Sequence, residues 1–171
     1  MTTSVPHRHL WSPDRLSSAD LQALLDTAAA LQRAQQRGDG WGPLRGRHLA
    51  LLIDRQDESA PAFQRAVHDL GGSVALLDAN DWQSSAGGRV PDAARLLGRL
   101  YDAIDCCDLP AALVEQIETH SGVPVFNGVA RPDHPLRRWI DASAAQRRLA
   151  ANPSAEQPQC LLQALLVCAI Q

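Results

Sequence analysis

Side chains that could do chemistry follow the four short apolar runs that the sequence predicts to be β-strands. They include two neighbouring carboxylates (Asp57 and Glu58), the thiol of Cys107 and the imidazole of His134. A carboxylate pair can move protons or bind a cation or an amine. A thiol can act as a nucleophile, and a histidine can exchange protons near neutral pH. The candidate ligand-binding residues are Gln56, Asp57, Glu58, Ser59, Gln83, Cys107, His134 and Arg137.

Each of these groups also has a purely structural interpretation, which we favour on residue type alone. Asp57 and Glu58 precede a predicted helix, where acidic residues are favourable because of the helix dipole. Carboxylates at Asp105 and Asp108 would raise the pKa of the Cys107 thiol, so an inert thiol is expected.

Metal and cofactor chemistry lacks the sequence patterns that it needs. The four cysteines form no CxxC pair and have no histidine at zinc-finger spacing. The glycine-rich segments 38–42 and 86–88 match neither a dinucleotide-binding nor a P-loop pattern. The chain has no lysine, which excludes Schiff-base chemistry. We expect no metal and no cofactor, whereas Trp82, in a predicted surface loop, suggests a partner surface.

The elements that must position these residues alternate between strand and helix. Apolar runs predict parallel strands at 48–53, 74–77, 103–107 and 123–126. Helical periodicity and start signals predict helices at 21–37, 60–70, 91–100, 110–119, 136–150 and 159–170. Residues 17–20 can cap the first helix, and residues 79–90 are predicted to form a long surface loop.

This alternation predicts an α/β fold. We expect a doubly wound, four-stranded parallel sheet with helices on both faces, plus a C-terminal helix that packs back on the domain. Ligands bind such sheets beyond the carboxyl ends of the strands, where the candidate residues lie.

Length and composition predict one domain over residues 1–171. It comprises an irregular arm at 1–16, a linker at 151–158 and a terminal helix at 159–171. The net charge of -3 gives no basic footprint for nucleic acid. The chain has neither a run of eighteen apolar residues nor a signal-peptide core, so no membrane partner is expected. Buried thiols fit a reducing cytoplasm.

Several blocks occur in an order that resembles the carbamoyl-phosphate domain of ornithine and aspartate carbamoyltransferases. They lie at residues 66–72 (AVHDLGG), 92–104 (DAARLLGRLYDAI), 121–128 (SGVPVFNG) and 134–136 (HPL). The resemblance covers roughly residues 10–150, with the ornithine type closer, and implies the same α/β fold.

The resemblance implies a carbamoyl-phosphate site that this chain has altered. The family's Ser-Thr-Arg-Thr-Arg motif falls on residues 56–60, where this chain has Gln-Asp-Glu-Ser-Ala. The family's arginine after the third strand falls on Cys107, and the glutamine of its His-Pro-x-Gln motif falls on Arg137. Gln83 and His134 match the residues that the family has at these positions. Because the neighbouring anion-binding residues differ, His134 is interpreted as a vestigial catalytic residue. One charge reversal at contact distance costs about 4 kcal/mol at an effective dielectric constant of about 20, so carbamoyl phosphate should be repelled.

The resemblance also implies a second, amino-acid-binding domain, for which the chain has no room. The apolar segment 160–169 resembles the family's last helix, which returns to the first domain. We infer an internal excision in which residues 151–158 replace the second domain. Because the family forms trimers through its first domain, a homotrimer is expected.

Three functions remain open on the sequence. The first is a non-catalytic carbamoyltransferase-like protein, or pseudoenzyme. It would act as a scaffold or regulatory subunit linked to arginine and ornithine or pyrimidine metabolism, with a full-length carbamoyltransferase as a partner. The second is a small-molecule binding module, in which Arg89, Arg137 and Arg138 bind another anion, or Asp57 and Glu58 bind an amine. The third is residual ornithine or aspartate carbamoyltransferase activity.

Overall fold

A computed structural model describes residues 11, 13–38, 42–54, 57–84, 89–136, 138 and 158–170. At residues 13, 83, 84, 158 and 159 it describes the backbone alone.

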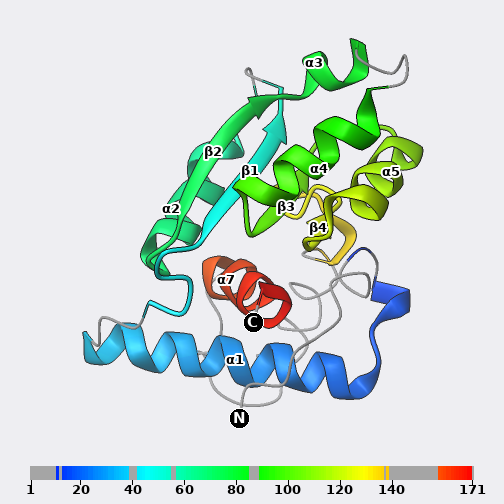
Figure 1. Cartoon of the computed structure of the whole chain (residues 1–171). Helices are drawn as coiled ribbons and strands as arrows, with labels where there is room; N and C mark the ends of the chain where they lie inside the picture. The colour runs from blue at the N-terminus through cyan, green and yellow to red at the C-terminus, as the bar shows by residue number, and fades with distance from the viewer. Residues whose placement is uncertain are drawn as a thin grey trace.

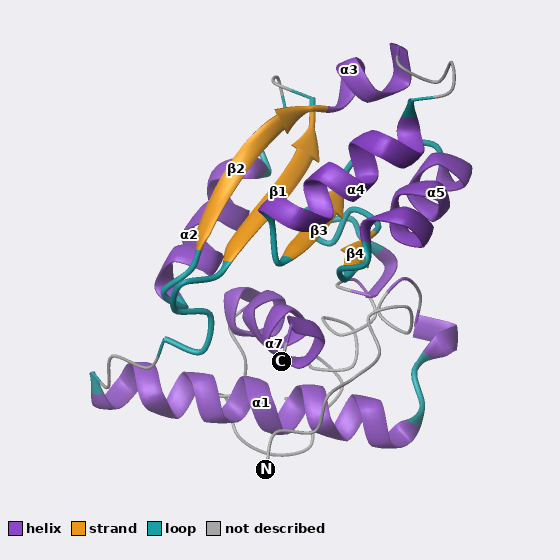
Figure 2. Ribbon diagram, in the orientation of Figure 1, coloured by secondary structure: helices purple, strands orange, loops and turns teal. Residues whose placement is uncertain are grey.

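Four parallel strands form one sheet, in the order β2-β1-β3-β4 (Figure 2). The strands are β1 (His48–Ile53), β2 (Ser73–Asp78), β3 (Ala103–Cys106) and β4 (Val125–Phe126). Five consecutive residues of β1 are buried, because this central strand has neighbours on both edges and helices on both faces. The predicted parallel sheet is confirmed, and β3 and β4 are each shorter than predicted.

Helices cover both faces of the sheet, as predicted (Figure 1). Helix α2 (Ala60–Asp69) packs on one face, and α4 (Val90–Leu100) and α5 (Ala111–Ser121) pack on the other. Alternate residues of β1 enter two separate cores, since successive side chains of a strand point to opposite faces. Leu49, Leu51 and Ile53 belong to the α2 side, and Ala50 and Leu52 to the other.

The last helix closes the α2 side of the domain. Helix α7 (Pro158–Ile170) lies between α1 (Ser18–Arg37) and the sheet, and it contacts both α1 and α2 (Figure 1). Its buried Gln163 accepts a hydrogen bond from Gln35 of α1 at 3.1 Å and donates one to the Ala66 carbonyl of α2 at 3.2 Å. The terminal helix therefore packs back on the domain.

The capping signal at the start of α1 is confirmed. The Ser17 hydroxyl accepts a hydrogen bond from the backbone N–H of Asp20 at 3.1 Å, and the Asp20 carboxylate accepts one from the N–H of Ser17 at 3.0 Å. This reciprocal pair satisfies two N–H groups that a helix start leaves without partners.

The predicted surface loop at 79–90 is wrong in its first half. Residues Ala79–Ser84 form helix α3, which begins where the Asp78 carboxylate accepts the N–H of Asn80 at 3.0 Å. Buried Ala79 and half-buried Trp82 pack against the core under α4, so Trp82 does not lie free on the surface. The sequence did not indicate this helix because most of its residues are polar, and Ala79 and Trp82 are the residues with described side chains that contact the core.

Other predictions fall partly or wholly outside the described residues. Most of the predicted helix at 136–150 and of the linker at 151–158 lies there, as do residues 1–10 and 12 of the arm. Residues Pro13–Arg15 form one 3-10 turn. The Trp11 indole donates a hydrogen bond to the Val125 carbonyl of β4 at 2.8 Å. Of the helices that the structure describes, none combines the length and the apolar character needed to cross a membrane.

Candidate functional site

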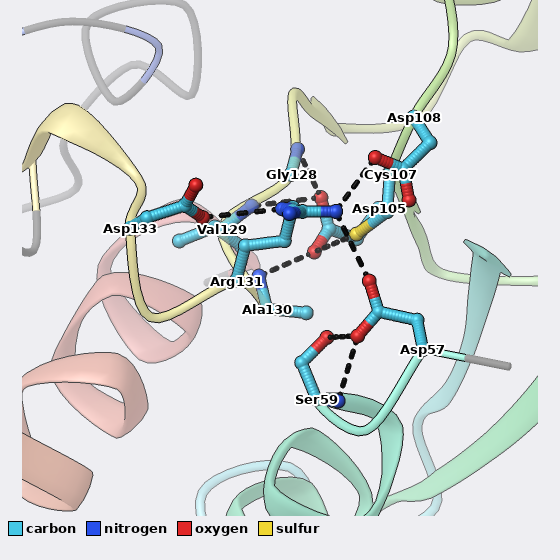
Figure 3. A network of polar contacts seen from close by, with 10 residues as sticks. All are labelled: Asp57, Ser59, Asp105, Cys107, Asp108, Gly128, Val129, Ala130, Arg131 and Asp133. Carbon is cyan, nitrogen blue, oxygen red and sulfur yellow. Dashed lines mark hydrogen bonds and ion pairs between the residues drawn. The ribbon is translucent and has the colours of Figure 1, made fainter. Parts of the chain in front are cut away.

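The loops that follow β1, β3 and β4 meet at one edge of the sheet and are joined there by a single arginine (Figure 3). Nη1 of Arg131 lies 3.0 Å from Oδ2 of Asp57 and 2.6 Å from Oδ1 of Asp108, and its Nε lies 3.1 Å from Oδ1 of Asp133. We call these four residues the Arg131 cluster. Each of the three loops contributes at least one carboxylate to it.

Negative charge exceeds positive charge in the Arg131 cluster. One guanidinium pairs with three carboxylates. The hydrogen bond from Arg131 is the main cause of the lowered pKa of the Asp133 carboxyl, and the charge of Arg138 adds to it. The Arg131 side chain is 35% exposed, so solvent screens the pairs only in part. An anion approaching this edge therefore meets carboxylates and a guanidinium that is already paired.

The backbone after β1 turns Asp57 toward the Arg131 cluster. Its Oδ1 accepts hydrogen bonds from the hydroxyl of Ser59 at 2.6 Å and from the N–H of Ser59 at 2.7 Å. These bonds, with the charge of Arg131, hold the pKa of the Asp57 carboxyl below its usual value. Oδ1 of Asp57 thus stabilises the turn into α2 through Ser59, and Oδ2 pairs with Arg131. Glu58 is exposed.

Asp108 reaches Arg131 through an unusual backbone conformation. Its φ is 61°, in the left-handed region that few residues other than glycine adopt, although aspartate tolerates it better than most. Strained backbone of this kind persists only where surrounding contacts hold it, and it is commoner at functional sites. Here the conformation accompanies the ion pair in which Oδ1 of Asp108 lies 2.6 Å from Nη1 of Arg131.

A buried carboxylate supports the turn that carries Arg131. Asp105 of β3 is 1% exposed and accepts the backbone N–H groups of Gly128, Val129 and Ala130 at 2.8, 3.1 and 2.7 Å. Burial raises the pKa of the Asp105 carboxyl to about 6, although these hydrogen bonds favour its ionised form.

Cys107 is unsuited to nucleophilic chemistry. The residue is fully buried, and its Sγ lies 3.9 Å from Oδ2 of Asp105. Burial raises the pKa of the Cys107 thiol far above its usual value, and the charges of Asp105 and Asp108 raise it further. Because the thiolate is the reactive form, the expectation of an inert thiol agrees with these surroundings.

His134 is buried behind the same edge. It is 5% exposed, and its Nδ1 accepts a hydrogen bond from the N–H of Leu136 at 3.3 Å. This contact fits the structural interpretation of His134, because it joins the imidazole to the backbone of the same loop.

Two cavities open at the carboxyl ends of the strands. One, of about 210 Å³, is bordered by His134, Arg131, Asp108 and Asp133. The other, of about 320 Å³, lies at the ends of β1 and β2 and is lined by Ile53, Asp54, Asp57, Ala60, Leu76, Leu77 and Asp78. Within the described residues no group of three or more histidine, cysteine or acidic side chains is placed to hold a metal ion.

Five of the predicted ligand-binding residues are described with their side chains and follow the strands as expected: Asp57, Glu58, Ser59, Cys107 and His134. Gln56 and Arg137 lie outside the described residues, and the structure gives only the backbone of Gln83, in α3. Whether any of these residues binds a ligand stays a prediction.

Sequence reasoning missed Arg131, the residue that joins the three loops. Its partners Asp57 and Asp108 are 74 and 23 residues away in the chain, so no local pattern marks the contacts. The one local signal is the neighbouring carboxylate of Asp133.

The strand order, and the loops gathered at one edge of the sheet, define a doubly wound α/β domain. Comparison with known sequences adds the particular family. Residues 8–147 match the carbamoyl-P binding domain of aspartate/ornithine carbamoyltransferase. The chain belongs to this family.

Two similar curated relatives are ornithine carbamoyltransferases. A catabolic ornithine carbamoyltransferase of Pseudomonas putida is 33% identical over 142 residues, which are 82% of this chain and 42% of that protein. The ornithine carbamoyltransferase of Cutibacterium acnes is 32% identical over 143 residues, or 83% of this chain and 43% of that protein. The chain thus spans less than half the length of the relatives it matches.

Solved structures of the same family share the fold. The ornithine carbamoyltransferase of Burkholderia thailandensis superposes with a TM-score of 0.67 at 21% identity, covering 86% of this chain and 49% of that one. An aspartate transcarbamoylase of Trypanosoma cruzi, solved with carbamoyl phosphate, gives a TM-score of 0.64 at 23% identity, covering 88% of this chain and 48% of that one.

Replacing Arg131 tests whether its cluster stabilises the domain. In Arg131→Gln, three carboxylates at one edge lose their shared cation, and we expect the free energy of unfolding at pH 7 to fall by about 1–2 kcal/mol. Arg95→Gln is the matched control, since Arg95 has one exposed ion pair, with Asp92 on α4, and should lose less than about 0.5 kcal/mol. Urea denaturation measures both values, and equal losses would contradict a stabilising role for the cluster.

Acid should weaken the same contacts. The folded state lowers the pKa of Asp57 and Asp133, so their contribution is present above the unfolded pKa of about 4 and is lost as pH falls through the lower folded values. We expect stability to fall between about pH 4 and pH 2, and to fall less steeply in Arg131→Gln. Denaturation curves at several pH values measure the slopes, and parallel slopes in the two proteins would contradict the assignment. Asp105 has the opposite pH dependence, because its pKa is raised in the folded state. Its contribution to stability is present below the unfolded pKa of about 4 and is lost as the pH rises to about 6.

Proposed function

We propose that this chain is a non-catalytic member of the carbamoyltransferase family, a pseudoenzyme that acts as a scaffold or regulatory subunit. The observation that supports this most strongly is the Arg131 cluster, in which a cation at the ligand-binding edge is paired with carboxylates from three loops. Its setting is arginine and ornithine or pyrimidine metabolism, where a full-length carbamoyltransferase is the partner we expect.

Charge is the reason that carbamoyl phosphate should not bind. The resemblance places the family's arginines at Glu58, Ala60 and Cys107, and none of these residues carries a positive charge. Arg131 does not substitute for them, since its Nη1 is bound to Asp57 and Asp108. Freeing it for a phosphate would leave those carboxylates without their partner and next to a second anion.

The arrangement around α7 supports a rearranged domain organisation. We propose that α7 corresponds to the family's last helix and that residues 151–158 stand where the amino-acid-binding domain would be inserted. The buried Gln163, bound to both α1 and α2, fits a helix that belongs to this domain.

A cytoplasmic homotrimer built from this domain is part of the proposal. Four buried free thiols fit a reducing compartment. Trimerisation rests on the family resemblance. It would let the chain assemble with copies of itself, or with a full-length carbamoyltransferase.

A remodelled binding module is the second candidate, and the cavity beside β2 favours it. Asp54, Asp57 and Asp78 line this space together with Leu76 and Leu77, which is a surface suited to an amine with an apolar part. Residual carbamoyltransferase activity is the third candidate and ranks last because of the missing cations.

Calorimetry with carbamoyl phosphate tests the main proposal. We expect no binding at about 1 mM ligand and no citrulline or carbamoyl aspartate above background. The paired change Glu58→Arg with Ala60→Arg, which restores two family arginines, should give measurable anion binding if the charge argument is right. The Pseudomonas putida relative serves as the positive control. Binding or turnover by the unchanged chain would overturn the proposal, whereas binding of an amine alone would favour the second candidate.

The mass in solution tests the assembly. We expect a particle of three times 18.5 kDa at micromolar concentration by light scattering. Addition of the full-length relative should give mixed trimers if the interface is shared. A chain that stays monomeric and does not bind the full-length relative would contradict the scaffold role.

A further inference from the structure

The carboxylate of Asp105 lies in an environment unlike that of any other described acid. Among the described residues it is the one acidic side chain that is buried, and it stands in the middle of the sheet opposite Leu51 of β1 and Phe126 of β4. Burying a charge is costly unless hydrogen bonds replace the lost water. The three N–H groups at 128–130 supply these bonds.

The same three N–H groups depend on Asp105 in turn. They are consecutive in the chain, and a buried N–H without an acceptor destabilises the folded state. The turn they form is closed by a 3.0 Å hydrogen bond from the N–H of Arg131 to the Gly128 carbonyl. The position of Arg131 therefore follows from the position of residues 128–130, which Asp105 sets (Figure 3).

The two oxygens of Asp105 are not equivalent. From the turn, Oδ1 accepts two backbone hydrogen bonds, those of Gly128 and Val129, whereas Oδ2 accepts one, that of Ala130 at 2.7 Å. Oδ2 also accepts a long contact from the Cys107 thiol at 3.9 Å. A proton is accommodated most easily on Oδ2, because only one backbone hydrogen bond of the turn is disturbed there. A protonated oxygen is a weaker acceptor, so the N–H of Ala130 would lose its strong bond, and Ala130 directly precedes Arg131.

We propose that Asp105 is a proton-controlled pin, a side chain that fixes the turn at 128–130 only when it is ionised. The ionised carboxylate holds this turn and keeps Arg131 between the three loops. The protonated carboxyl releases the N–H of Ala130 and loosens the Arg131 cluster. The step is the uptake of one proton from solvent, and no covalent bond other than the O–H is formed. The three loops at the ligand-binding edge are thereby coupled to pH.

Burial raises the pKa of the Asp105 carboxyl to about 6, so the change falls within the range that cells experience. The apolar side chains of Leu51 and Phe126 flank Asp105 in the sheet, and the described residues of α7 carry no charge. The thiols of Cys106 and Cys107 stay neutral in this range, because burial raises the pKa of each.

Other titratable or charged groups nearby belong to the loops. They are the guanidinium of Arg131, the carboxylates of Asp57, Asp108 and Asp133, and the imidazole of His134. The pKa values of Asp57 and Asp133 are lowered, so these two carboxyls stay ionised where Asp105 titrates. The imidazole of His134 can also take up a proton, so the experiment must separate His134 from Asp105.

Nuclear magnetic resonance of the whole chain tests the pin. Between about pH 4.5 and 7.5, the amide signals of Gly128, Val129 and Ala130 should shift together with one midpoint near 6. After correction for intrinsic chemistry, hydrogen exchange at Ala130 should be about tenfold faster at pH 5 than at pH 7, in proportion to the protonated fraction. Asp105→Asn, a neutral variant of the same shape, should show the low-pH behaviour throughout.

Two variants serve as controls. Asp133→Asn removes an exposed carboxylate from Arg131 but leaves the pin intact, so it should keep the transition. His134→Gln should keep it as well. The inference is overturned if the wild-type amides do not titrate, if Asp105→Asn still shows the transition, or if His134→Gln abolishes it.

If Asp105→Asn does not fold, the carboxyl carbon of Asp105 can be followed in the unchanged chain. A midpoint shared with Ala130 supports the pin, and a carboxyl that stays ionised down to about pH 4 contradicts it.

Discussion

The guanidinium of Arg131 binds carboxylates from the loops after β1, β3 and β4, and the arrangement of the ligand-binding edge depends on these contacts. The strands end at this edge because the sheet is parallel, but the parallel arrangement alone does not fix how their loops meet. Arg131 supplies that link. Its own position rests on the buried carboxylate of Asp105, which holds the preceding turn.

The family fold survives here with a different charge distribution at its ligand-binding edge. The two-sided core, the strand order and the packing of α7 depend on apolar burial, which tolerates changes in the loops. Anion binding depends instead on a few cations with unpaired donors. Here acidic residues lie near those positions, and the guanidinium of Arg131 is paired with them.

The sequence predicted the larger elements well because each carries a strong local signal. Helix α1 has leucine and alanine at helical spacing and a capping pair at Ser17 and Asp20, and β1 is a continuous apolar run. Helix α3 was missed because its polar residues resemble a loop, whereas its Ala79 and Trp82 pack against a core built from distant parts of the chain. Trp82 is half-buried rather than fully exposed for the same reason, and a partner surface there stays a prediction.

By itself the sequence determined the order of strands and helices, the family, and the loss of arginines from the expected anion site, since these follow from local pattern and residue type. The tertiary structure alone decided which charges meet. Asp57 and Arg131 are 74 residues apart and lie 3.0 Å from each other only because parallel strands bring their ends to one edge. The pairing of Asp105 with the turn at 128–130 arises in the same way. Such contacts depend on geometry across the sheet, which no local window of residues contains.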